Sequence, residues 1–109
     1  RIILRGTMPA EFAIKSFEYR FTMQTPRFSP DDAVKVKERL TVVIDALLKQ
    51  RWYRSKATVS PHHEDTLVVD YCVTAYTRDR KSIEEAVTDM HETACIRAIP
   101  EYSFLCEDL

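Results

Sequence analysis

The segment Ser29–Trp52 carries the longest hydrophobic repeat in the chain, and it restricts the possible folds more than any other feature. Ser29 can cap a helix with its hydroxyl, and Pro30 suits the first helical turn. Apolar side chains then recur every three or four residues, which places them on one side of a helix of about six turns. They are Ala33, Val36, Leu40, Val43, Ile44, Leu47 and Leu48. Such a helix needs a hydrophobic partner, and the flanking segments predict a sheet.

Four other segments alternate polar and apolar residues, as strands with one buried face do. The first is Phe17–Gln24, and the second, Lys56–Ser60, ends at Pro61, which suits a sheet edge. The third, Thr66–Thr77, is apolar in both phases, which indicates a central strand. Alternation returns over Tyr102–Leu109, where we expect the last strand.

A second helix is expected before that last strand. Ser82 and Glu85 have the spacing of a capping box, and apolar residues follow at helical spacing until Pro100 stops the helix. The element order therefore predicts an α+β, ferredoxin-like βαββαβ fold. This is a two-layer sandwich with a four-stranded antiparallel sheet and both helices on one face.

The composition fits one globular domain, with 109 residues of which 45% are hydrophobic. We expect that domain to span residues 15–109. Residues 1–14 form an N-terminal extension, in which residues 1–7 are either vector-derived or a short native strand. The net charge of -1 disfavours a general polyanion binder but is compatible with a local basic patch. The odd number of cysteines and the lack of a membrane-length apolar run predict a cytoplasmic protein.

Motifs for catalysis, metals and cofactors are weak. A single glycine excludes Gly-rich phosphate loops. The polar run at residues 62–65 and the pair His91 and Cys95 supply metal-ligand types, but neither forms a complete ligand set. Cys72, expected on the open face of the sheet, is the candidate nucleophile among the cysteines, although the sequence places no base beside it. We therefore expect no metal and no cofactor, and we favour a binding protein over an enzyme.

The leading functional hypothesis concerns the sheet face that the helices leave open. That face is expected to mix apolar and charged side chains, as a modest interaction surface does. The expected interface residues are Arg20, Val68, Cys72, Tyr76 and Leu105. This pattern favours a small binding or regulatory module that acts through protein contacts, as a homodimer.

The alternative hypothesis is RNA, other nucleic-acid or phosphate binding at one end of the sheet. The loops at residues 49–56 and 77–81 are expected to meet at that end, next to a helix N-terminus that favours anions. The candidate residues are Lys49, Arg51, Trp52, Tyr53, Arg54, Lys56, Arg78, Arg80 and Lys81. The competing interpretation is that Trp52 and Tyr53 pack under the helix end, while the charges are solvated and paired with Asp79, Glu107 and Asp108. Stacking on the sheet face is disfavoured, because Tyr76 is the only aromatic residue expected there.

Overall fold

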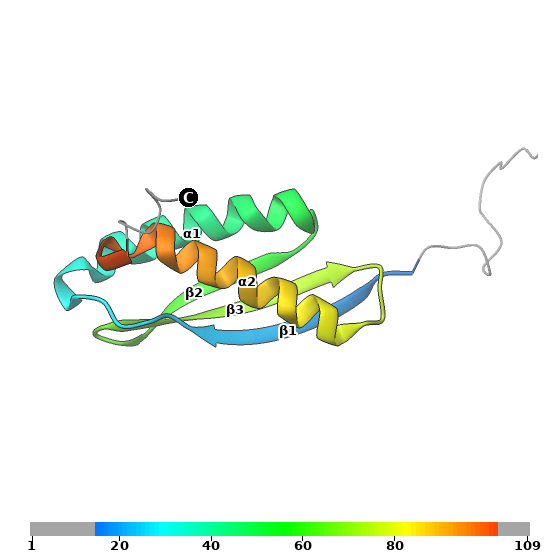
Figure 1. Ribbon diagram of the computed structural model, residues 1–109, viewed down its shortest axis with the longest axis horizontal. Coiled ribbons are helices and arrows are strands. Elements are labelled where there is room, and N and C mark those ends of the chain that lie inside the picture. Colours follow the sequence, from blue (N-terminus) through cyan, green and yellow to red (C-terminus); the bar gives the residue numbers. More distant parts are fainter. Residues whose placement is uncertain (1–14, 103–109) are drawn as a thin grey trace, which may run out of the picture.

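The computed structural model describes residues 15–102 as a three-stranded antiparallel sheet with two helices on one face (Figure 1). The elements are β1 (Phe17–Gln24), η2 (Pro30–Asp32), α1 (Ala33–Arg51), β2 (Lys56–His63), β3 (Thr66–Ala75), α2 (Arg80–Ala98) and η3 (Pro100–Tyr102). The strand order is β1-β3-β2, so β3 is central and β1 and β2 are the edges. None of the described helices is long and apolar enough to cross a membrane.

The prediction of a four-stranded ferredoxin-like sheet is wrong, because the described residues contain no strand after α2. Tyr102 belongs to the 3-10 helix η3, in which its N–H donates to the Ile99 carbonyl at 3.0 Å. Ile99 is fully buried, so core packing directs the chain into this turn. The rest of the expected strand, residues 103–109, lies outside the described part of the chain.

The central position of β3 is confirmed, and its two faces differ. Alternate residues are buried under the helices, namely Leu67, Val69, Tyr71, Val73 and Ala75. The other phase faces the open side of the sheet and is only half-buried at Val68, Cys72 and Thr74. β1 pairs with β3 over its whole length, whereas the pairing of β2 shifts between Pro61 and His63. His62 and His63, which begin the polar run at residues 62–65, therefore lie at the end of β2.

The hydrophobic stripe of the first helix is confirmed. Val36, Leu40, Ile44 and Leu48 are buried in α1, and Ala33, Val43 and Leu47 pack against the same core from its margin. The start of the helix differs from the expectation. Ser29 makes no side-chain capping bond, and the chain enters α1 through η2.

The second helix begins earlier than its expected capping box. Asp79 is the N-cap, and its carboxylate accepts a hydrogen bond from the Ser82 N–H at 3.1 Å. A carboxylate at this position satisfies a free N–H group and suits the positive end of the helix dipole. Ser82 is therefore a residue of the first turn. Because α2 begins at Arg80, the connection from β3 to α2 is shorter than a cap at Ser82 would have made it.

Candidate functional site

The two connections at one end of the sheet form a groove of about 610 Å³. Residues 52–55 join α1 to β2, and residues 76–79 join β3 to α2. The lining residues are Arg51, Trp52, Tyr53, Arg54, Thr74, Ala75, Tyr76, Thr77 and Ile83. We call this depression the aromatic–basic groove. The structure thus brings together two loops that are more than 20 residues apart in the chain.

Ser55 fastens the α1–β2 connection to the end of β3. Its N–H donates to the Trp52 carbonyl at 2.9 Å, and its side-chain oxygen accepts from the Thr74 N–H at 3.0 Å. Ser55 is buried, so loss of these bonds would leave polar groups without water. The two walls of the aromatic–basic groove are therefore held in register by a buried polar contact.

Two tyrosines of the groove are exposed, Tyr53 by 82% and Tyr76 by 64%. Trp52 differs, because it packs against the hydrophobic core and also carries the Arg51 guanidinium 5.1 Å from its ring centroid. The expectation that the aromatic residues could pack under the helix end holds for Trp52 only. The rings of Tyr53 and Tyr76 remain available to a ligand.

The arginines at this end form no ion pair with a carboxylate of residues 15–102. Arg78 lies over Phe17 and Arg80 over Phe21, with guanidinium-to-centroid distances of 5.2 and 4.7 Å. A ring face positions a cation without neutralising it. The ion pairs among residues 15–102 join Arg20 to Glu18, Arg27 to Asp65 and Lys49 to Asp45. None of them involves an arginine of this end.

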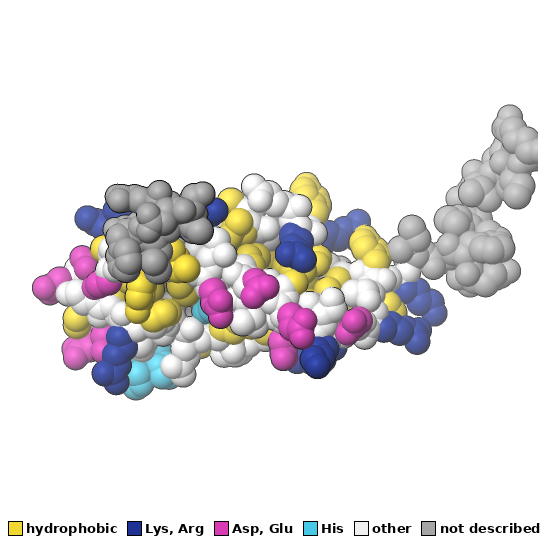
Figure 2. All heavy atoms as spheres, in the orientation of Figure 1, with side chains coloured by type: hydrophobic (Ala, Val, Ile, Leu, Met, Phe, Trp, Pro, Cys, Tyr) yellow, Lys and Arg dark blue, Asp and Glu magenta, His cyan; other side chains and the backbone are white. Residues whose placement is uncertain are grey.

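Basic side chains also gather here on the molecular surface. On the face shown in Figure 2, dark blue Lys and Arg side chains lie at the right-hand end, where Figure 1 places the β3–α2 connection. Of the candidate residues, Arg51, Trp52, Tyr53 and Arg54 line the groove, whereas Lys49, Lys56, Arg78, Arg80 and Lys81 do not. Lys49 is instead paired with Asp45 at 3.1 Å.

The residues predicted as a protein interface do not form one patch. Arg20 and Cys72 are neighbours in the middle of the open sheet face, and Val68 lies opposite Gln24 near its far end. Tyr76 follows the last residue of β3 and lines the aromatic–basic groove. Eight residues of extended chain separate Val68 from Tyr76 by about 26 Å. Leu105 lies outside the described residues, and the homodimer stays a prediction.

Cys72 has charged neighbours, but they do not make its thiol an activated nucleophile. Burial and a hydrogen bond to Glu18 raise the pKa of the Cys72 thiol. The Arg20 side chain, 3.0 Å from the Glu18 carboxylate, lowers the pKa of that carboxyl by hydrogen bonding. Cys72 is therefore a protonated thiol near neutral pH, and thiolate chemistry is not favoured here.

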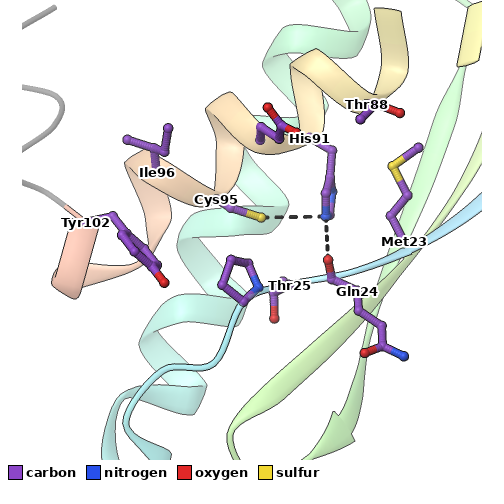
Figure 3. Close-up of a pocket in the computed structure, with 10 residues that line it drawn as sticks. Met23, Gln24, Thr25, Thr88, His91, Cys95, Ile96 and Tyr102 are labelled. Atoms are coloured by element: carbon purple, nitrogen blue, oxygen red, sulfur yellow. Dashed lines mark hydrogen bonds between the residues drawn. The ribbon is translucent and has the colours of Figure 1, made fainter. Parts of the chain in front are cut away.

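A second depression, which we call the apolar slot, lies between the end of β1 and α2 and measures about 600 Å³ (Figure 3). Its lining residues are Met23, Gln24, Thr25, Pro26, Thr88, His91, Glu92, Cys95, Ile96 and Tyr102. The sequence does not reveal this slot, because no local pattern links the end of β1 to α2 side chains that lie more than 60 residues later.

His91 connects α2 to two strands beside the slot. Its Nε2 lies 2.9 Å from the Gln24 carbonyl oxygen, and its Nδ1 lies 2.6 Å from the Tyr71 hydroxyl. A carbonyl can only accept, so Nε2 carries the proton and the Tyr71 hydroxyl donates to Nδ1. The buried ring is therefore fully hydrogen-bonded in its neutral form.

The neighbouring Cys95 is an inert thiol. Its sulfur lies 3.7 Å from His91 Nε2, as Figure 3 shows, but burial raises the pKa of the Cys95 thiol to about 12. The His91 nitrogen that faces the sulfur already carries a proton. The pair therefore has no base oriented toward the thiol, and its arrangement supports packing and not nucleophilic catalysis.

Metal ligation finds no support in residues 15–102, where no cluster of three or more His, Cys, Asp or Glu side chains could hold an ion. His62 and His63 contact each other edge to face, with ring centroids 4.1 Å apart. The His62 Nδ1 lies 3.3 Å from the Thr66 hydroxyl. These two rings belong to the surface of the β2–β3 hairpin.

The His91 network predicts a loss of stability in mild acid. Burial lowers the pKa of His91 below its ordinary value of 6.5, while the Gln24 carbonyl and Glu92 act in the opposite direction. The unfolded chain therefore takes up a proton near pH 6.5 that the folded chain does not. The contribution of neutral His91 to the free energy of unfolding is complete above about pH 6.5. It is lost as the pH falls toward the pKa of His91 in the folded protein, by at most about 1.4 kcal/mol per pH unit.

Urea unfolding of the unmodified protein and of His91→Gln, from about pH 7 to about pH 5, measures this effect. The unmodified protein should lose stability faster with acid than the variant does. Parallel curves for the two proteins would show that His91 does not titrate differently in the folded and unfolded states.

Comparison of the chain with protein-family models, curated proteins and solved structures finds no match. The functional argument therefore rests on the geometry of the described residues.

Proposed function

We propose that the protein is a small binding module that takes single-stranded nucleic acid in the aromatic–basic groove. One observation carries the proposal. Two loops place the exposed rings of Tyr53 and Tyr76 on the same groove as Arg51 and Arg54, whose charges no described carboxylate neutralises.

The two residue types fit the two parts of a nucleotide. Every base has a π-face that can stack on a tyrosine ring, and every phosphate is attracted to a guanidinium. A duplex hides the faces of its bases in its own stack, whereas a single strand leaves them open to the rings of Tyr53 and Tyr76. Single strands therefore suit this surface better than duplexes do.

The same chemistry predicts weak sequence discrimination. Stacking and phosphate contacts are available to all nucleotides, whereas sequence is read by hydrogen bonds to base edges. Binding should also depend strongly on salt, because contacts to phosphates release counterions. Because the net charge is only -1, attraction to phosphates depends on local clusters of basic side chains and not on the total charge.

Removal of either tyrosine ring should weaken binding. Tyr53→Ala and Tyr76→Ala should each reduce the binding free energy by about 1–3 kcal/mol, the usual contribution of a stacked base. Fluorescence anisotropy with a labelled single-stranded oligonucleotide of mixed sequence, at low salt, measures the change. Tyr53 and Tyr76 are exposed, so the fold should be retained.

Tyr53→Phe and Tyr76→Phe are the matched controls, since they keep the ring and remove only the hydroxyl. Their affinities should stay close to that of the unmodified protein. Failure of the unmodified protein to bind any single strand at low salt would end the proposal. Equal losses for the Phe and Ala variants would indicate that the hydroxyl, and not stacking, holds the ligand.

A further inference from the structure

The aromatic–basic groove continues into a broader depression on the open sheet face. That depression measures about 940 Å³ and is lined by side chains from all three strands. Arg54 and Thr74 line both the groove and the depression. The two hollows therefore form one continuous surface that turns from the end of the sheet onto its open face.

The row nearest the groove is that of Thr74, opposite which lies Glu18, whose carboxylate is paired with Arg20 at 3.0 Å. The next row is basic on both flanks. In the strand register, Arg20 of β1 and Lys56 of β2 both face Cys72 of β3. Lys56 is exposed and forms no ion pair with a described residue. Arg20 shares its charge with Glu18, so Lys56 is the stronger anion contact of the row.

The charge changes sign one row farther along the sheet. There Asp70 lies between Thr22 and Thr58, and its carboxylate accepts a hydrogen bond from the Thr22 hydroxyl at 2.7 Å. A chain of phosphates would meet attraction at the Cys72 row and repulsion at the Asp70 row. Cys72 is four residues from Tyr76, about 13 Å along β3.

We propose that a bound single strand leaves the aromatic–basic groove at Arg54 and continues across the open sheet face. Lys56 and Arg20 hold its phosphates there, and Asp70 marks the end of the path. This inference rests on the proposed function and extends the site from the loops to the sheet. It explains the polar character of a face that no described element covers and that was expected to bind protein.

Oligonucleotides of two lengths distinguish binding in the aromatic–basic groove from binding on the open sheet face. A strand of about four nucleotides matches the groove, whereas one of about twelve is long enough to reach the sheet; these lengths fall within the range of about 4–16 nucleotides that single OB folds bind. Lys56→Gln combined with Arg20→Gln should weaken the longer strand about 25-fold near 0.1 M salt, since each lost phosphate contact lowers the salt slope by about 0.7. The shorter strand should bind as before.

Asp70→Asn tests the end of the path by a gain of affinity. Asparagine keeps an oxygen that accepts the Thr22 hydrogen bond and removes the negative charge. The longer strand should bind about fivefold more tightly, the value of one phosphate-sized charge contact at that salt. The shorter strand should not change.

Lys35→Gln combined with Lys37→Gln is the charge-matched control, because both lysines are exposed on α1, which covers the other face of the sheet. Circular dichroism confirms that each variant is folded. Equal losses for both strand lengths, or no loss for the longer strand, would overturn the path while leaving binding in the groove intact. No binding of either strand by the unmodified protein would overturn the proposed function and the path with it.

Discussion

Replacing Arg51, Arg54, Arg78 and Arg80 together by glutamine should weaken single-strand binding by about 10²–10³-fold near 0.1 M salt. Each guanidinium that contacts a phosphate contributes about 0.7 to the salt slope of a single strand, so four lost contacts lower that slope by about 2.8. Anisotropy titrations at several salt concentrations measure both quantities. The affinities of the variant and the unmodified protein should converge at high salt.

The control for this variant removes the same number of charges elsewhere. Lys35, Lys37, Arg39 and Arg97 are exposed on α1 and α2, and the α1 members lie about 20 Å along the helix from Arg51. Their replacement by glutamine should change the affinity little, because salt screens charges beyond about 10 Å. Equal losses for the two variants would mean that net charge, and not the aromatic–basic groove, determines binding.

The parts of the fold that were predicted correctly are those with a long and regular pattern. The α1 stripe spans about four turns, and only one helix face accommodates it. Apolar residues at both alternating sets of positions in β3 indicated a central strand, and β3 is central. The set that is buried is the one under the helices. The strand predicted after α2 rested on short alternation, and it failed where burial of Ile99 and the turn of η3 direct the chain instead.

The sequence allowed the position of the aromatic–basic groove to be predicted, because the order of helices and strands determines which loops lie at the same end of the sheet. Because both helices cover the same face of the sheet, the C-terminus of α1 and the C-terminal end of β3 lie at the same end of the sheet. This holds with or without a fourth strand. The exact role of Tyr76 depended on a strand boundary. Because β3 ends at Ala75, Tyr76 lies in the aromatic–basic groove and not on the open sheet face.

The His91 network shows what sequence patterns omit. Its partners, Tyr71 and the Gln24 carbonyl, lie 20 and 67 residues from His91 in the chain. The helical spacing of His91 and Cys95 was visible, but the hydrogen bonds that determine their protonation come from other elements. Such a network is found only when the strands have been placed.

Replacing Leu40 by alanine should lower the free energy of unfolding by about 2–5 kcal/mol. Leu40 is completely buried in α1, within the cluster that joins this helix to the sheet and to α2. The substitution removes apolar contacts and leaves a cavity that its neighbours fill only in part. Because small domains are stable by only about 5–15 kcal/mol, this loss should be evident as a large shift of the urea midpoint.

Val42→Ala is the matched control on the same helix, since Val42 is 69% exposed. It removes side-chain carbons from the solvent-facing side, where alanine also has the higher helix propensity, so stability should stay within about 0.5 kcal/mol. A Leu40→Ala loss below about 0.5 kcal/mol would contradict the placement of this face in the core. A large loss for Val42→Ala would instead show that the outer face of α1 is covered, and that the helix packs against more than the described sheet and α2.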